Sequence, residues 1–263
     1  MLPKWIKEPL EAFQRGRRSR AVFRRLNASG EGLEIGPCHN GIATKREGFR
    51  VKILDHLDQE GLRQKYQDHP GVDVSRIEMV DFVWNGESYS EVTGGAKFDW
   101  IIASHVIEHV PDLVRFLGEC CGLLRSKGRL YLVVPDCRRE FDRRRFPSGS
   151  GEVVDAHLRG DVRPTPGAVA EHHLRAVTKG GRHAWPWWWP GGYASIHTTI
   201  EVVDAFGAAR EGQYKDIHVW RFTPDSFRML LDDLRRLGYL KMDIVGEIVA
   251  SGSEFSVCLG LSE

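Results

Sequence analysis

Residues 33–41 read Leu-Glu-Ile-Gly-Pro-Cys-His-Asn-Gly, an apolar strand pattern that runs directly into a glycine turn. A glycine after a buried strand lets the backbone bend sharply and approach a ligand closely. Asp55 follows a second apolar stretch, 51–54, and lies nineteen residues beyond Gly36. A carboxylate there can accept both hydroxyls of a ribose, in charge-assisted bonds worth about 1.5–3 kcal/mol each. A strand, a glycine turn and an acid about twenty residues later predict a nucleoside site on an open α/β sheet.

The chain on both sides of this turn alternates between strand and helix patterns. Strand-like stretches lie at 32–35, 51–54, 77–82, 98–103 and 129–134, and helical spacing is found at 59–66 and 112–124. This alternation predicts an α/β fold with a doubly wound, mostly parallel sheet and right-handed crossovers. Thr223 is expected to cap a helix that runs to Arg236, and two closing strands at 240–248 and 254–261 complete a seven-stranded sheet.

The regular pattern is interrupted between 138 and 222. This stretch contains several prolines, Gly-Gly pairs and the run Trp185-Pro-Trp-Trp-Trp-Pro190, and it is too rich in tryptophan for a disordered linker. We therefore expect an insertion after the fifth strand. The expected segments are a basic N-terminal helix (1–27), a nucleoside-binding core (28–137), a substrate-binding or lid insertion (138–222), and a helix with a strand hairpin (223–263) that completes the core.

Composition limits the classes of protein to which the chain can belong. Of its 263 residues, 41% are apolar and 28% are charged, and the formal net charge of +1 does not favour a nucleic-acid partner. The five unevenly spaced cysteines suit free thiols, and no apolar run reaches the length of a membrane span. A cytoplasmic protein is expected. The basic N-terminal helix either packs on the core or meets a membrane or an acidic partner.

Residues 28–137 resemble the class I S-adenosylmethionine-dependent methyltransferases, especially the methyltransferase type 11 group, in which the fourth strand ends in a pattern such as Ser-x-x-x-Glu-His-x-x-Asp, here 104–112. The resemblance implies a Rossmann-like methyltransferase fold with S-adenosylmethionine as its cofactor. It also implies cofactor contacts from Glu34, Gly36, Pro37 and Cys38 at the turn, Asp55 and His56 at the ribose, Asp81 and Phe82 at the adenine, and Ser104 and His105 at the methionine and its methyl group. Cys38 stands where the family usually has a second glycine.

The whole chain is similar to a subgroup associated with sugar and glycan biosynthesis, on the stretches 54–57, 134–136 and 216–224. This similarity implies O-methylation of a small molecule or of a sugar or glycan precursor. Two alternatives stay open: a methyltransferase acting on RNA or protein, and a non-catalytic nucleoside-binding protein of the same fold. No metal site is expected, because the cysteines and histidines lack Cys-x-x-Cys spacing.

A hydroxyl acceptor needs a general base, and the insertion is where substrate-facing residues are expected. The candidates are Asp136, His157, His172, His173, His197 and His218, and among them we favour His218, His173 and Asp136. The Trp185–Trp189 cluster is either a platform for a sugar ring or a lid packed on the core. Arg143–Arg145 either bind a phosphate or are solvated charges. The sequence names neither the methyl acceptor nor the oligomeric state.

Overall fold

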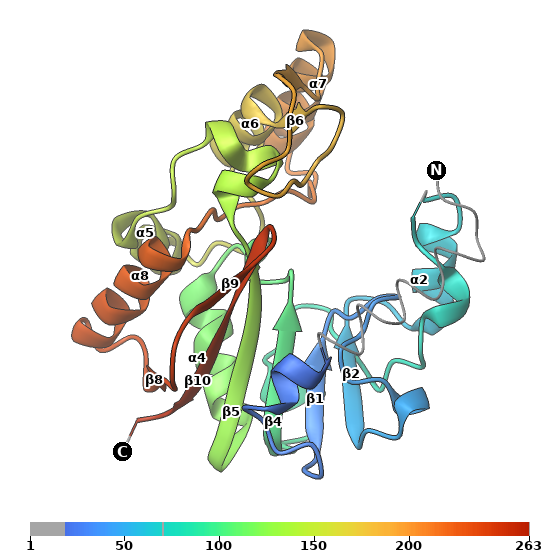
Figure 1. Ribbon diagram of the computed structural model, residues 1–263, viewed down its shortest axis with the longest axis vertical. Helices are drawn as coiled ribbons and strands as arrows, with labels where there is room; N and C mark the ends of the chain where they lie inside the picture. Colours follow the sequence, from blue (N-terminus) through green and yellow to red (C-terminus); the bar gives the residue numbers. More distant parts are fainter. Residues whose placement is uncertain (1–18, 70, 263) are drawn as a thin grey trace.

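The computed structural model describes residues 19–69 and 71–262 (Figure 1). In these residues the strands are β1 (Gly32–Ile35), β2 (Val51–Asp55), β3 (Phe82–Val83), β4 (Phe98–Ser104), β5 (Leu124–Pro135), β6 (Val177–Lys179), β7 (Tyr193–Ser195), β8 (Met242–Ile244), β9 (Val249–Ser251) and β10 (Glu254–Leu261). The α-helices are α2 (Gln59–Tyr66), α3 (Tyr89–Val92), α4 (Leu113–Leu123), α5 (Ser150–Arg159), α6 (Pro166–Arg175), α7 (Thr199–Arg210) and α8 (Pro224–Arg236). Short 3-10 turns are η1 (Lys45–Glu47), η2 (Val74–Arg76), η3 (Cys137–Arg139) and η4 (Phe141–Arg144).

The main sheet has the order β3-β2-β1-β4-β5-β10-β8, with β9 paired to β10. Strands β1 to β5 pair in parallel, and β10 runs antiparallel to both β5 and β8. This arrangement confirms the predicted doubly wound fold with an antiparallel last strand. The sheet has eight strands instead of seven, because residues 249–251 fold back on β10 as a separate short strand.

Strand β4 is buried on both faces of the sheet, as its apolar sequence predicts. Ile101 and Ala103 face the larger apolar cluster, which includes residues of α4 and α8. Trp100 and Ile102 face a smaller cluster that contains Val22 and other residues of the N-terminal stretch. Most of the predicted N-terminal helix lies outside the described residues, and its described end, 19–23, is helical. Burial on both sides is what holds a parallel sheet together.

Helix α8 begins and ends where the sequence predicts. The Thr223 side chain accepts a hydrogen bond from the Ser226 amide, and Pro224 occupies the first turn. Its buried positions Phe227, Leu230, Leu231 and Leu234 follow the helical period, which places one face on the core. The chain leaves the helix through Gly238, whose φ of 80° is left-handed.

Three predicted strands differ from the observed ones. The third strand was expected over 77–82, but only the two-residue β3 forms. The Asp81 carboxylate accepts the Ile53 amide, which would otherwise pair with the backbone of a longer third strand. Strand β5 begins at Leu124 instead of 129, since the expected turn at 126–128 continues the strand. The stretch 240–248 forms only β8.

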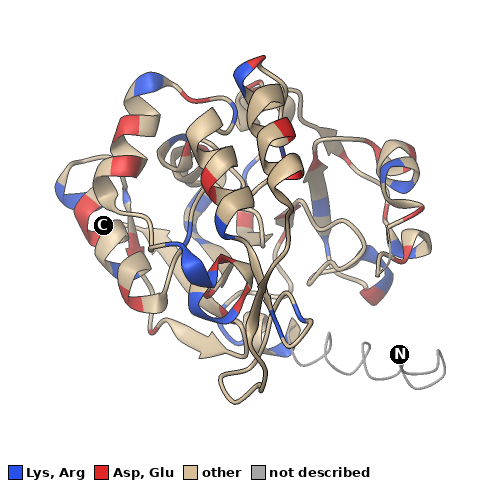
Figure 2. Cartoon of the chain, turned by 90° about the horizontal axis from the view of Figure 1, so that it is seen from above, with Lys and Arg blue, Asp and Glu red and all other residues tan. Residues whose placement is uncertain are grey.

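Within the segment 138–222, α5 lies beside α8, while α6, α7 and β6 lie beyond the carboxyl ends of the parallel strands (Figure 1). The segment holds α5, α6 and α7 together with a separate two-stranded sheet, β6-β7. Seen from above, basic and acidic positions are interspersed over the helices and loops, in line with the net charge of +1 (Figure 2).

Candidate functional site

A cavity of about 820 Å³ lies where β1, β2 and β4 end. Its walls come from the turn after β1, the end of β2, the loop after β3, the end of β4 and two stretches of the insertion, 161–162 and 214–216. Strands β2 and β4 flank β1 on opposite sides, so this is the crevice at which an open α/β sheet binds ligands. The volume falls within the usual range of about 300–1,000 Å³ for small-molecule sites.

The turn after β1 has the backbone geometry of a ligand cradle. Gly36 has φ 62° and Cys38 φ 46°, both in the left-handed region. A Cβ on Gly36 would stand 3.1 Å from Val106, so the position is both strained and crowded for any other residue. The carboxylate of Glu34 accepts the amides of Ile42 at 2.6 Å and Ala43 at 3.0 Å. Glu34 therefore holds the far end of the turn against the sheet, in addition to lining the cavity.

Asp55 lines the cavity at the end of β2 and is almost fully buried. Its Oδ1 accepts the His56 amide at 2.8 Å and contacts His56 Nδ1 at 2.6 Å. The His56 ring in turn contacts Lys65 through Nε2 at 2.9 Å. Among the described residues no hydrogen bond reaches Asp55 Oδ2, which leaves that oxygen available to a ligand. Asp55 and His56, both predicted to contact the cofactor, thus line the same cavity.

The predicted adenine contact of Asp81 and Phe82 does not fit the structure. The Asp81 carboxylate is held by Lys45 Nζ at 2.5 Å and Lys52 Nζ at 3.1 Å, and it caps the Ile53 amide. Partial burial opposes ionisation, but the two lysines outweigh it and lower the pKa of Asp81. Neither Asp81 nor Phe82 lines the cavity; the next residues, 84–86, do. The physical reason is that β3 starts later than its apolar pattern suggests.

Ser104 and His105, predicted to contact the methionine part of the cofactor, line the cavity. His105 has a left-handed φ of 54°, and its ring lies between two carboxylates. Nε2 is 2.9 Å from Glu254 and Nδ1 is 3.4 Å from Glu108. Desolvation alone would lower the pKa of His105, but the two carboxylates outweigh it and raise the pKa to about 9. His105 therefore carries a positive charge at neutral pH, which makes it a poor general base.

His109 is a cavity residue that the sequence analysis did not name as a candidate base. Its ring lines the cavity, and Nδ1 lies 2.8 Å from Oδ1 of Asp216, which also lines it. The hydrogen bond from His109 lowers the pKa of Asp216 despite partial burial. A carboxylate on Nδ1 favours the tautomer whose Nε2 keeps a lone pair. His109 lies in the stretch 104–112 and Asp216 in the stretch 216–224, both of which the sequence analysis singled out. Nothing in the sequence showed that these two stretches meet in the fold.

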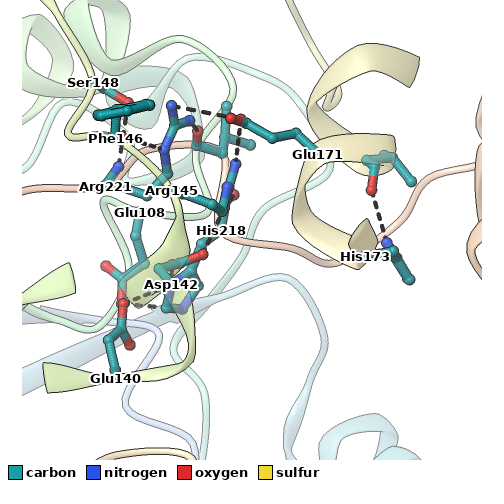
Figure 3. A network of polar contacts seen from close by, with 12 residues as sticks. Glu108, Glu140, Asp142, Arg145, Phe146, Ser148, Glu171, His173, His218 and Arg221 are labelled. Atoms are coloured by element: carbon teal, nitrogen blue, oxygen red, sulfur yellow. Dashed lines mark hydrogen bonds and ion pairs between the residues drawn. The ribbon is translucent and has the colours of Figure 1, made fainter. Parts of the chain in front are cut away.

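His218 belongs to a buried polar network beside the cavity, not to its wall (Figure 3). Nδ1 is 2.7 Å from Asp142 and 3.4 Å from Glu140, and Nε2 is 4.0 Å from Glu108. Burial disfavours the charged ring, but the carboxylates outweigh it and raise the pKa of His218 to about 10. Arg145 adds a second cation, 2.7 Å from Asp142. His218 is thus a buried cation and is ill suited to accept a proton from a substrate.

The other two favoured base candidates are also placed away from the cavity. Both carboxylate oxygens of Asp136 bind the Arg138 guanidinium, at 2.8 and 2.6 Å. The Nδ1 of His173 contacts the Val169 carbonyl at 2.8 Å within its own helix. Neither residue lines the cavity, so the catalytic roles predicted for Asp136 and His173 do not fit this geometry.

Two groups of side chains in the polar network have metal-ligand spacing. Glu108, His109 and His218 form one group and Glu140, Asp142 and His218 the other, with ligand atoms within 4.8 Å of one another. A histidine must be neutral to bind a metal. In the described residues both groups belong to an ion-paired network, in which Arg145 pairs with Asp142 and carboxylates raise the pKa of His218 to about 10.

Comparisons with known proteins place the chain among proteins of one family. A family model described as a methyltransferase domain matches residues 10–234. The mitochondrial ubiquinone biosynthesis O-methyltransferase of Homo sapiens is 32% identical over 105 residues, which are 38% of this chain and only 27% of that protein. Two solved structures are similar over almost the whole chain. The CcbJ methyltransferase from Streptomyces caelestis has 11% identity, 94% and 95% coverage of the two chains and a TM-score of 0.46. The glycopeptide N-methyltransferase MtfA, complexed with sinefungin, has 13% identity, 92% coverage of each chain and a TM-score of 0.45.

Proposed function

This chain belongs to the methyltransferase-domain family, and from that premise we propose that it methylates an oxygen atom of a small molecule or of a sugar or glycan precursor. The activity class follows from the family: the protein is an S-adenosylmethionine-dependent methyltransferase. Bound S-adenosylmethionine supplies a methyl group already activated for displacement. What remains for the chain is to hold the cofactor, align the acceptor and remove its proton.

The residues of the cavity fit this cofactor. We assign the ribose hydroxyls to Asp55 Oδ2, which no described side chain or amide occupies. The turn at Gly36–Cys38 lines the cavity, and glycine at 36 leaves the backbone there without a side chain, which suits close approach by the methionine part. The adenine is assigned to the loop residues Trp84–Gly86, in place of Asp81 and Phe82. Ser104 and His105 are assigned to the methionine end of the site.

The contact between His109 and Asp216 is the main support for an oxygen atom as the methyl acceptor. A hydroxyl loses its proton when it is methylated, so a positioned base accelerates the reaction by about 10²–10⁴-fold. We propose that His109 takes this proton through Nε2 while Asp216 holds its Nδ1–H. Because Asp216 belongs to the insertion and His109 to the core, the base is complete only when the insertion packs beside the cavity.

The size of the acceptor is limited by the insertion. Val162, Tyr214 and Asp216 line the cavity opposite the core residues, which leaves space for a small molecule or a terminal sugar. The similarity of 216–224 to proteins of glycan biosynthesis includes Asp216 and supports a sugar acceptor. The formal net charge of +1 does not favour RNA as the acceptor.

The test is methyl transfer from labelled S-adenosylmethionine to a panel of acceptors matched in size. The panel contains sugars, sugar phosphates, phenols and the corresponding amines. We expect label on the hydroxyl acceptors, since a positioned base assists only an acceptor that loses a proton. Label on the amines alone, on RNA or on protein would contradict the proposed acceptor. Binding of the demethylated cofactor without transfer to any acceptor would favour a non-catalytic protein instead.

A further inference from the structure

The loop between β6 and β7 carries exposed aromatic rings that the methyl-transfer site does not use. Residues 180–192 join the two strands and include the run Trp185-Pro-Trp-Trp-Trp-Pro190. Trp187 is 77% exposed and Trp188 is 61% exposed. The β6-β7 sheet is separate from the main sheet, and β6 lies beside α6 and α7 in the lobe beyond the carboxyl ends of the strands (Figure 1).

This loop is held in place by its other two tryptophans. Trp185 is only 3% exposed, and its amide donates to the Arg139 carbonyl at 2.8 Å. Trp189 is half-buried under the Arg182 guanidinium, which lies 3.8 Å from the centre of the ring. The loop therefore has two anchoring indoles and two that face solvent. Exposed neighbouring indoles do not stabilise the fold of an isolated chain. Such exposed apolar patches mark sites that bind a membrane or another protein.

The segment of sequence that carries the exposed indoles contains basic residues, among them Lys179 and Arg182. No acidic residue occurs between Glu171 and Glu201 in the sequence. Arg144 and Lys179 each lie 5.9 Å from the Tyr193 ring, which is 41% exposed. We define the hairpin patch as the six residues that combine these exposed rings and cations, which are Arg144, Lys179, Arg182, Trp187, Trp188 and Tyr193.

We propose that the hairpin patch docks this protein on an anionic membrane surface. Tryptophan and tyrosine favour the headgroup region of a bilayer, where the ring is in an apolar layer and the polar edge stays hydrated. Lysine and arginine beside them gain from the negative potential of anionic lipids. No helix in the described ranges, 19–69 and 71–262, is long and apolar enough to cross a bilayer. The contact is therefore a peripheral one, and it is independent of the acceptor proposed above.

The test is sedimentation of the full-length protein with vesicles of phosphatidylcholine alone and with vesicles that also contain phosphatidylglycerol. We expect binding to the anionic vesicles, and weaker binding at about 0.5 M salt, where charges are screened within a few ångström. Replacing Arg144 and Lys179 by glutamine should weaken binding roughly 25-fold, since each cation near the surface contributes about a factor of five. Trp187→Ala with Trp188→Ala should weaken it at least about tenfold, through lost apolar contact.

The matched control is Met229→Ala with Leu237→Ala, which removes apolar side chains that are 66% and 59% exposed at α8, away from this lobe (Figure 1). This control should bind anionic vesicles like the unchanged protein. Circular dichroism confirms that each variant is folded. Equal binding by the Trp187/Trp188 variant, or no binding by the unchanged protein, overturns the proposal. So does a dimer of the unchanged protein that the tryptophan substitutions dissociate, because the patch would then meet a second copy.

Discussion

Replacing Asp55 by alanine tests the cofactor site most directly. The carboxylate is almost fully buried, its Oδ1 is occupied by His56, and the residue lines the cavity. One charge-assisted hydrogen bond from a ribose hydroxyl is worth about 1.5–3 kcal/mol, so losing a single bond weakens affinity at least about tenfold. If both hydroxyls bind the carboxylate, the loss exceeds about a hundredfold.

The assay is isothermal titration calorimetry with S-adenosylhomocysteine. Asp55→Asn keeps the shape and an acceptor atom for the His56 amide, and it should fall between the unchanged protein and Asp55→Ala. Asp68→Ala is the matched control, because Asp68 is exposed and follows α2 in the sequence. Thermal unfolding shows whether the loss of the His56 contact alters the fold. An affinity of a folded Asp55→Ala protein within twofold of the unchanged one would refute the ribose assignment.

Three further predictions follow from the site and its network. Gly36→Ala should lose about 1–2 kcal/mol of stability from the left-handed φ of 62° and should bind S-adenosylhomocysteine more weakly, as denaturant unfolding and calorimetry can show. His109→Ala should lower kcat by about 10²–10⁴-fold with little change in that affinity, and Asp216→Asn should shift the pH profile of kcat; unchanged kinetics in both would remove the proposed base. His218→Gln should cost about 3–5 kcal/mol at neutral pH, because it leaves buried carboxylates unpaired. In the unchanged protein the contribution of His218 is complete below its ordinary pKa of 6.5 and is lost as the pH rises toward about 10, so the free energy of unfolding should fall over that interval. His69→Gln, at an exposed position, should leave that pH dependence intact.

The nucleoside crevice could be predicted from the sequence because its parts are local. The turn at 36–38 follows directly from a buried strand, and Asp55 ends the next strand along the chain. Parallel strands bring their carboxyl ends to one edge of the sheet, so a position in the sequence translates into a position in space. The N-cap at Thr223 was predictable for the same reason, since a cap depends on only the next three residues.

The tertiary structure alone decided which polar residues meet. His109 and Asp216 are separated by 107 residues, and no periodicity indicates that the insertion brings one against the other. His218 had the residue type of a base, but its surroundings of Asp142 and Glu140 make it a buried cation. Protonation depends on the charges and the burial around a side chain, and these come from distant segments. The sequence by itself therefore determined the fold and the position of Asp55 at the end of its strand, while three-dimensional packing decided that His109 meets Asp216 and left Trp187 and Trp188 in solvent.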